Sequence, residues 1–372
     1  MARRRLWRTR TPRLAPALLL AGALTACSHA RMIAAPSQFA LVYRAPSGNV
    51  VLASVDGAGA RRLGVGTQAL LAPNGSRVAA LSNGGTASLT IYQTEIAKHA
   101  ERVLSHVALR LGRPDWSGEH VQLLAWSPDS RLLALSADSL SANGEQPELL
   151  VLNTVSDTLS TIAAGDFLGA SFAPGLPDRL VYAAASIDQL DDNTVPLFTA
   201  SANGSDRRQL TRTGLAADPV WGAAGIVFAR LSRLGSPTSA PRYQLWLIGA
   251  HGRGLRRLTH IAAGPPVPDA AGAALSLSAS GTRLVANFAS PNPNVSAIDV
   301  WTVELARART IVHRLTFNGA QFIAQGLSRR GGRILLSALD SAGKQAAVES
   351  LPWAGGQPGL LVAGGAGPSW NR

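Results

Sequence analysis

The densest group of side chains with chemical potential lies in the stretch SHVALRLGRPDWSGEH, residues 105–120. Within it, Asp115, Trp116, Glu119 and His120 bring two carboxylates, an indole and an imidazole close together. This amphipathic set is typical of a binding hot spot, because a tryptophan buries much apolar surface while polar neighbours fix its orientation. The alternative is that Trp116 only pins a long loop to its scaffold.

A second group is acidic and lies in SIDQLDDN, residues 186–193. Asp188, Asp191 and Asp192 are candidates for binding a cation or a basic partner. The alternative is a solvated acidic loop, because their spacing does not match that of a calcium-binding loop. We therefore predict neither a metal site nor a cofactor.

Motifs of known catalytic mechanics are missing from the sequence. It contains no Gly-x-Ser-x-Gly elbow, no His-Glu-x-x-His, no Walker loop and no Cys-x-x-Cys pair. The seven histidines are scattered along the chain. We therefore expect a protein without catalytic activity, although histidines from distant repeats could still meet around a metal.

The single cysteine, Cys27, follows a basic segment and an apolar run from Leu14 to Leu24. These are the parts of an export signal, and the apolar run is too short to span a membrane stably. The sequence LTACS around Cys27 resembles a bacterial lipobox, which implies cleavage before Cys27 and acylation of its thiol. We expect a signal peptide at 1–26, a tether at 27–38 and one domain at 39–372. The alternative is an ordinary signal peptide with a chance cysteine.

The net charge is smaller after removal of the signal. Six of the 35 Lys and Arg residues lie before Cys27, which leaves 29 basic and 22 acidic residues and a net charge of +7. A basic exported protein meets lipid headgroups and anionic envelope polymers more readily than nucleic acid. Aromatic residues make up only 5% of the chain, few for stacking on single-stranded nucleic acid. We therefore expect no nucleic-acid partner.

The elements that must position these residues are visible as a repeat of about fifty residues. Each copy has an apolar lead residue, a polar turn, usually a basic residue, and a β-rich run, as in WSPDSRLLALSA from Trp126. Each copy then continues with a second β-rich run and, in several copies, a short arginine-led run such as RRLT. The lead positions are Leu71, Trp126, Phe172, Trp221, Leu277 and Leu327.

Alternation of apolar and polar residues, with Gly, Pro, Asn and Asp between the runs, predicts about four short strands per copy. One four-stranded sheet cannot cover both of its faces, and radial stacking of such sheets solves this problem. We therefore predict an all-β fold, a β-propeller with four antiparallel strands per blade. A β-sandwich is the alternative, but it would not repeat a four-strand phrase at this period.

The phrases WSPDSRLLALS and RRLT are similar to the repeat of TolB-type propellers, with its Trp-Ser-Pro-Asp-Gly core and Arg-x-Leu-Thr ending. The resemblance covers nearly all of the chain after Cys27. It implies a WD-like propeller in a bacterial envelope lipoprotein, here without the N-terminal domain of TolB.

Loop lengths indicate which face of the propeller would bind. The connections between first and second strands and between third and fourth strands are short. The connections between second and third strands and between successive blades are expected to be long and variable, and these include both candidate loops. We place binding on the face of the long connections, because binding residues concentrate on long loops held by a rigid scaffold. Arginine pairs recur on the outermost strand, where they either form a basic rim or protect an edge strand from aggregation. The pairs are 61–62, 207–208 and 256–257.

The last segment, GPSWNR, places Trp370 in the lead position of a repeat that then stops. The runs at 39–45, 49–57 and 60–64 read as strands two, three and four of a blade that lacks its first strand. We predict that the tail supplies that strand, which gives seven blades with Trp370 in the core of the closure. A six-bladed ring is the alternative.

Two functions are compatible with this sequence. The first is a lipoprotein held in the membrane by lipid on Cys27, whose propeller binds an envelope protein or polymer. Because Ser28 rather than aspartate follows the cysteine, sorting to the outer membrane, facing the periplasm, is expected in a cell with two membranes. The second is a lyase or hydrolase with its site at the mouth of the central channel. An enzyme requires His, Asp, Glu or Arg side chains from several blades near the axis, whereas a scaffold can offer small and apolar ones.

Overall fold

The computed structural model describes residues 41–84, 86–94, 102–108, 121–141, 144–185, 194–235, 241–261, 263–269, 272–292, 295–305, 310–315 and 321–370. All of them belong to one compact unit, Pro36–Arg372. The described residues form seven four-stranded sheets, and every strand pair within these sheets is antiparallel. Among them, no helix has the length and apolar character needed to cross a bilayer.

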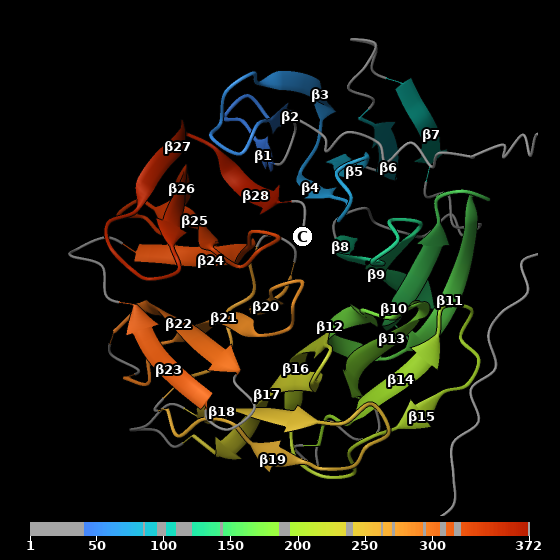
Figure 1. Ribbon diagram of the computed structural model, residues 1–372. Helices are drawn as coiled ribbons and strands as arrows, with labels where there is room; N and C mark the ends of the chain where they lie inside the picture. Colours follow the sequence, from blue (N-terminus) through green and yellow to red (C-terminus); the bar gives the residue numbers. More distant parts are fainter. Residues whose placement is uncertain are drawn as a thin grey trace, which may run out of the picture. The chain divides into compact units, whose positions relative to one another are not determined.

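The seven sheets are the blades of a β-propeller, set around a common centre (Figure 1). Blade 1 combines the two ends of the described chain. From the centre outward, it consists of β28 (Ala366–Trp370), β1 (Leu41–Arg44), β2 (Asn49–Ala53) and β3 (Arg61–Val65).

The other six blades each use four consecutive strands, which run from the centre outward in chain order. Blade 2 consists of β4 (Gln68–Leu71), β5 (Arg77–Gly84), β6 (Thr86–Gln93) and β7 (Arg102–Ala108). Blade 3 consists of β8 (Gln122–Trp126), β9 (Leu132–Ser141), β10 (Gly144–Asn153) and β11 (Thr158–Ala164). Blade 4 consists of β12 (Asp166–Ala173), β13 (Leu176–Ala185), β14 (Leu197–Ser201) and β15 (Arg208–Gln209).

Blades 5 to 7 continue the same order around the ring. Blade 5 consists of β16 (Ala216–Gly222), β17 (Gly225–Arg233), β18 (Arg242–Ile248) and β19 (Arg256–Arg257). Blade 6 consists of β20 (Leu275–Leu277), β21 (Arg283–Ala289), β22 (Ile298–Leu305) and β23 (Thr310–Leu315). Blade 7 consists of β24 (Gln321–Leu327), β25 (Arg333–Leu339), β26 (Gln345–Pro352) and β27 (Gly359–Ala363).

Ring closure by the tail is confirmed. Strand β28 pairs with β1, with Leu41 opposite Trp370, and the red and blue ends lie together in Figure 1. The innermost strand of each blade contacts that of the next, and β28 contacts both β24 and β4. The ring therefore has seven blades, and the six-bladed alternative is wrong.

A separate apolar core lies between each pair of neighbouring blades, seven in all. Strand β13 shows why the sequence folds this way: Leu180 and Tyr182 pack towards blade 3, whereas Val181 and Ala183 pack towards blade 5. Successive side chains of a strand point to opposite faces, so a blade buried on both faces needs nearly continuous apolar runs.

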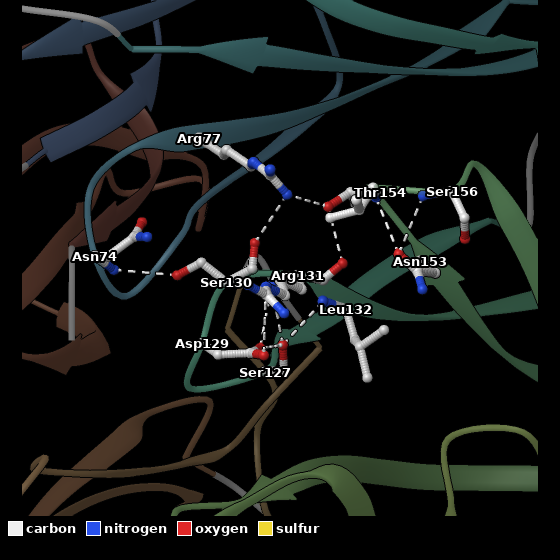
Figure 2. A network of polar contacts seen from close by, with 11 residues as sticks. Asn74, Arg77, Ser127, Asp129, Ser130, Arg131, Leu132, Asn153, Thr154 and Ser156 are labelled. Carbon is white, nitrogen blue, oxygen red and sulfur yellow. Dashed lines mark hydrogen bonds and ion pairs between the residues drawn. The ribbon is translucent and has the colours of Figure 1, made fainter.

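In the copy that opens blade 2, the basic residue of the repeat has a structural role at a blade interface. Arg77, which opens β5, donates through Nη1 to the carbonyl oxygen of Ser130 at 3.2 Å and to the hydroxyl of Thr154 at 2.5 Å, both in blade 3 (Figure 2). The backbone N–H of Asn74 donates to Ser130 Oγ at 3.2 Å. The polar turn of one blade is thus clamped by the preceding blade.

The loop prediction holds on one face and only in part on the other. The first-to-second turns are short throughout, for example the residues between Trp126 and Leu132. The opposite face carries long connections at 234–241 and 258–274, but strands β9 and β10 are joined by 142–143 alone, and β1 and β2 by 45–48. The expectation of long connections was wrong there: blade 3 instead extends two ten-residue strands into a hairpin.

Candidate functional site

The candidate site is the channel at the centre of the ring, where three hollows follow one another between the innermost strands. The lower cavity, on the face of the short first-to-second turns, has a volume of ≈ 320 Å³. The upper cavity, on the face of the long connections, has a volume of ≈ 330 Å³. A third cavity, of ≈ 30 Å³, shares Val220 with the lower cavity and Asp218 with the upper one, so it lies between them.

Residues of all seven blades line the lower cavity. They are mostly the lead residues and their turns, which include the half-buried Trp221 and the exposed Pro128, Pro174 and Ala279. Among the described residues of this lining, the only charged side chain is that of Arg329, and none is His, Asp, Glu, Lys, Cys or Tyr. The described side chains that line the lower cavity are therefore mostly apolar or aromatic, with three serines and one exposed cation among them.

Two of the three serines that line the lower cavity accept hydrogen bonds from a neighbouring blade. Ser171 Oγ accepts a hydrogen bond of 3.2 Å from the backbone N–H of Trp221 in the next blade. Ser369 Oγ accepts one of 3.3 Å from the backbone N–H of Leu71 in the same way. No described residue of this lining is a base that could activate either hydroxyl.

The upper cavity differs because it contains a carboxylate. Asp218 lines it together with Tyr243, Gln122, Phe167 and a set of prolines. The Oδ1 of Asp218 accepts a hydrogen bond of 3.2 Å from the backbone N–H of Ala274 in blade 6. None of the described residues that line this cavity carries a cationic side chain.

The surroundings of Asp218 change its titration. The pKa of the Asp218 carboxyl is raised to about 7. Burial is the largest cause, and the nearby carboxylate of Asp269 also raises the pKa, whereas the hydrogen bond from Ala274 lowers it. Burial also raises the pKa of Tyr243, and the charge of Asp218 adds to that rise. A titrating carboxyl in a cavity is a candidate functional group.

The backbone at Asp218 is also unusual. Its φ is 50°, in the left-handed region, which is unfavourable for residues other than glycine and is tolerated best by Asn and Asp. Asp218 lies in a bulge of β16, where Asp218 and Pro219 together oppose one residue of β17. The corresponding bulges of β12 and β28 hold Gly169 and Gly367, at φ 97° and 52°. An aspartate thus occupies a position that two other blades give to glycine.

The predicted site residues mostly lie outside the described residues. This is the case for Cys27, Asp115, Trp116, Glu119, His120, Asp188, Asp191 and Asp192. Trp370 is described, with 4% of its surface exposed, and it packs between blades 7 and 1 against Leu41, Tyr43 and Leu335. The arginine pairs lie on or beside the outermost strands, as predicted.

Asp218 was missed by the sequence analysis, although a signal for it exists. It stands three residues before the lead residue Trp221, and Gly169 and Gly367 stand three residues before Phe172 and Trp370. Alignment of the repeats on their lead residues shows the aspartate at a position where two other copies have glycine and the remaining four have Gln, Leu, Ala and Ala. Within the described part of the chain, no three His, Cys, Asp or Glu side chains gather closely enough to hold a metal ion.

No family model matches the chain, and no curated protein matches it in sequence. Similar solved structures include a hypothetical selenium-binding protein from Sulfolobus tokodaii, with a TM-score of 0.56 and 12% identity over 91% of this chain and 94% of that one. An oligogalacturonate lyase from Vibrio parahaemolyticus has a TM-score of 0.52 and 10% identity, over 83% and 93%. TolB from Acinetobacter baumannii has a TM-score of 0.44 and 16% identity over 90% of this chain, which spans only 66% of that TolB chain. The likeness is one of fold: the chain is a seven-bladed β-propeller, the fold that its TolB-like repeats predict.

Proposed function

We propose that this protein is a lipid-anchored component of the cell envelope whose propeller binds a protein or an envelope polymer and carries out no reaction. The observation that supports this most is the lower cavity, an apolar and aromatic hollow contributed by all seven blades. Binding hot spots are enriched in Trp and Arg near the centre of an interface, and here Trp221 lines the hollow while Arg329 lies at its rim.

The dimensions of the lower cavity also suit binding. Its ≈ 320 Å³ lies at the lower end of the range for ligand sites, which is about 300–1,000 Å³. Its walls are the ends of innermost strands and the short turns that follow them. Because these walls are already in place, binding should cost little conformational entropy of the protein. An apolar, proline-rich mouth favours a protein segment with apolar side chains over a highly charged polymer.

The test uses two neighbouring arginines of one turn. Arg329 and Arg330 are both exposed, but only Arg329 lines the lower cavity. A photo-crosslinking residue at Ala279, in native envelopes, should capture a specific partner. Arg329→Glu should reduce that capture strongly, and the matched control Arg330→Glu should leave it unchanged.

A second crosslinking position serves as the reference for non-specific capture. Leu360 is 63% exposed on the outermost strand β27, away from the channel. Identical products from Ala279 and Leu360, consisting of lipid and bulk envelope proteins, would contradict partner binding at the lower cavity.

Membrane anchoring through Cys27 is part of the same proposal and is tested separately. Cys27→Ser removes the thiol that would be acylated, so the protein should leave the membrane fraction while the propeller keeps its melting temperature. Several acyl chains anchor firmly because each buried methylene contributes about 0.8 kcal/mol. Unchanged fractionation of the variant would show that Cys27 does not carry the anchor.

An enzymatic function is the alternative, and the upper cavity favours it through one observation. A carboxyl whose pKa lies at about 7 beside a tyrosine hydroxyl is a suitable general base, and Asp218 and Tyr243 meet this description. The fold does not decide between a binding protein and an enzyme, because propellers similar to this one include an oligogalacturonate lyase. Release of new chain ends from an anionic polysaccharide by the wild type, and none by Asp218→Asn, would establish the enzyme.

A further inference from the structure

Asp218 presents an uncompensated acidic group to the upper cavity. The described residues give it one hydrogen bond, from Ala274, and no ion pair. Its ionisable neighbours are Asp269, in the connection from β19 to β20, and Tyr243 on β18, and neither supplies a positive charge. A largely buried carboxylate without a cation is unfavourable, and the described residues provide no positive charge to compensate Asp218.

The backbone makes this arrangement more costly still. Asp218 adopts a left-handed conformation directly before Pro219, although the residue before a proline prefers an extended one. Gly169 and Gly367 occupy the equivalent bulges without that strain. Backbone strain at a non-glycine residue points to a use for the side chain when the residue also lines a cavity.

The walls of the upper cavity define what would complement this carboxylate. Phe167 and Tyr243 supply aromatic rings, and Pro265, Pro266 and Pro268 supply rigid apolar surface. Aromatic faces attract cations, and apolar walls accept a hydrocarbon stem. The complementary ligand therefore has one positive charge on an aliphatic chain.

We infer that the upper cavity is a binding site for an alkylammonium group, which forms an ion pair with the carboxylate of Asp218 while its methylenes lie against the prolines and Phe167. The group is either a free amine or the side chain of a lysine on a protein. The site lies at the opposite end of the channel from the lower cavity, and its existence does not depend on partner binding there.

Binding at this site is linked to pH. An ammonium ion pairs only with the ionised carboxylate, so it displaces the proton that Asp218 holds below its pKa of about 7. Affinity should therefore be highest above that pH and should fall about tenfold per pH unit well below it. Neighbouring Asp269 strengthens the attraction for a cation, and neutral Tyr243 does not oppose it.

The experiment measures binding of n-hexylammonium by calorimetry and ligand-observed NMR near pH 8, with n-hexanol as the neutral probe. Asp218→Asn keeps the size and the left-handed backbone but removes the charge. It should weaken n-hexylammonium binding at least about tenfold and leave n-hexanol unaffected. The matched control is Asp157→Asn, because Asp157 is also left-handed, at φ 54°, but lies exposed in the turn between β10 and β11.

Two further comparisons complete the test. A blocked peptide with one lysine between alanines distinguishes the sources: tighter binding than n-hexylammonium indicates a lysine of a partner, and weaker binding indicates a free amine. The inference is overturned if n-hexylammonium binds Asp218→Asn as well as the wild type, if Asp157→Asn loses as much affinity, or if the wild type does not prefer n-hexylammonium to n-hexanol.

Discussion

The guanidinium Nη1 of Arg283 in blade 6 donates a 2.8 Å hydrogen bond to the carbonyl oxygen of Gly331 in blade 7. Arg77 makes the same contact with Ser130, at 3.2 Å, between blades 2 and 3. Gly331 and Ser130 are the left-handed residues of their turns, at φ 65° and 61°. In these two copies the basic position of the repeat is a blade-to-blade clamp, whereas Arg179 and Arg333 contact Asp206 and Ser350 of their own blades.

Loss of this clamp should weaken the ring. Arg283→Ala removes the bond to Gly331 and the stacking on Trp353, whose ring centroid lies 5.0 Å from the guanidinium carbon. Hydrogen bonds to charged groups contribute about 1.5–3 kcal/mol, so we expect the free energy of unfolding to fall by about that amount. Urea denaturation measures it, and Arg330→Ala on the exposed turn should change it by less than about 0.5 kcal/mol. Equal effects of both variants would refute the clamp.

Trp370 should be essential for the closure of the ring. Its indole packs against Leu41 and Val348, and truncation of a buried tryptophan to alanine costs about 3–5 kcal/mol. Trp370→Ala and deletion of 367–372 should both lower the melting temperature, and the deletion should lower it more. Leu360→Ala, on the exposed outer strand, should leave it nearly unchanged. A deletion variant with the wild-type melting temperature would show that the tail does not close the ring.

Asp218 should make stability fall as pH rises. The folded protein holds its proton up to pH about 7, whereas the unfolded chain loses it near pH 3.8, so the folded state binds more protons between these values. Stability is then highest at the acidic end of this window and decreases through it, by up to about 4 kcal/mol when complete. Asp218→Asn should therefore raise the melting temperature near pH 8 and leave it similar near pH 4.

Asp157→Asn provides the control for that pH dependence. Asp157 shares the left-handed backbone but is exposed, so its substitution should shift the melting temperature equally at both pH values. If Asp218→Asn also gave the same shift at both, the carboxyl of Asp218 would not be the titrating group.

Tyr182 offers a substitution that should stabilise the protein. Its side chain is fully buried, its ring stacks on Phe198 at 5.5 Å between centroids, and its hydroxyl has no hydrogen-bond partner among the described residues. Tyr182→Phe keeps the ring and removes a buried, unpaired polar group, so the free energy of unfolding should rise by about 1 kcal/mol. Tyr182→Leu, which loses the stacking, should lower it. Destabilisation by Tyr182→Phe in thermal or urea unfolding would mean that the hydroxyl is paired.

The repeat made the blade count predictable, because each lead residue, such as Trp126 or Trp370, lies at the end of an innermost strand or one residue before it. Periodic apolar runs identify strands wherever both faces are buried, as in Leu180 to Ala183. The short hairpin between β9 and β10 was less visible, since the polar residues around 142–143 read equally well as loop.

The channel was harder to predict than the fold. Which side chains face the axis depends on bulges in the innermost strands, and a bulge shifts register without changing the composition of the strand. Asp218 faces the upper cavity because of such a bulge, and its altered pKa comes from burial and from Asp269, which is distant in sequence. Neither cause is visible in a local motif.

The pairing of Leu41 with Trp370 also sets the order in which the domain can form. Six blades use consecutive strands and can assemble as soon as their own segments are available, whereas blade 1 must wait for the last strand. Contacts between residues so distant in sequence slow folding, because the entropy of closing a long loop is lost before the contact forms. We therefore expect the pairing of β28 with β1 to be the last and slowest step in the folding of the domain, possible only once Trp370 has been synthesised.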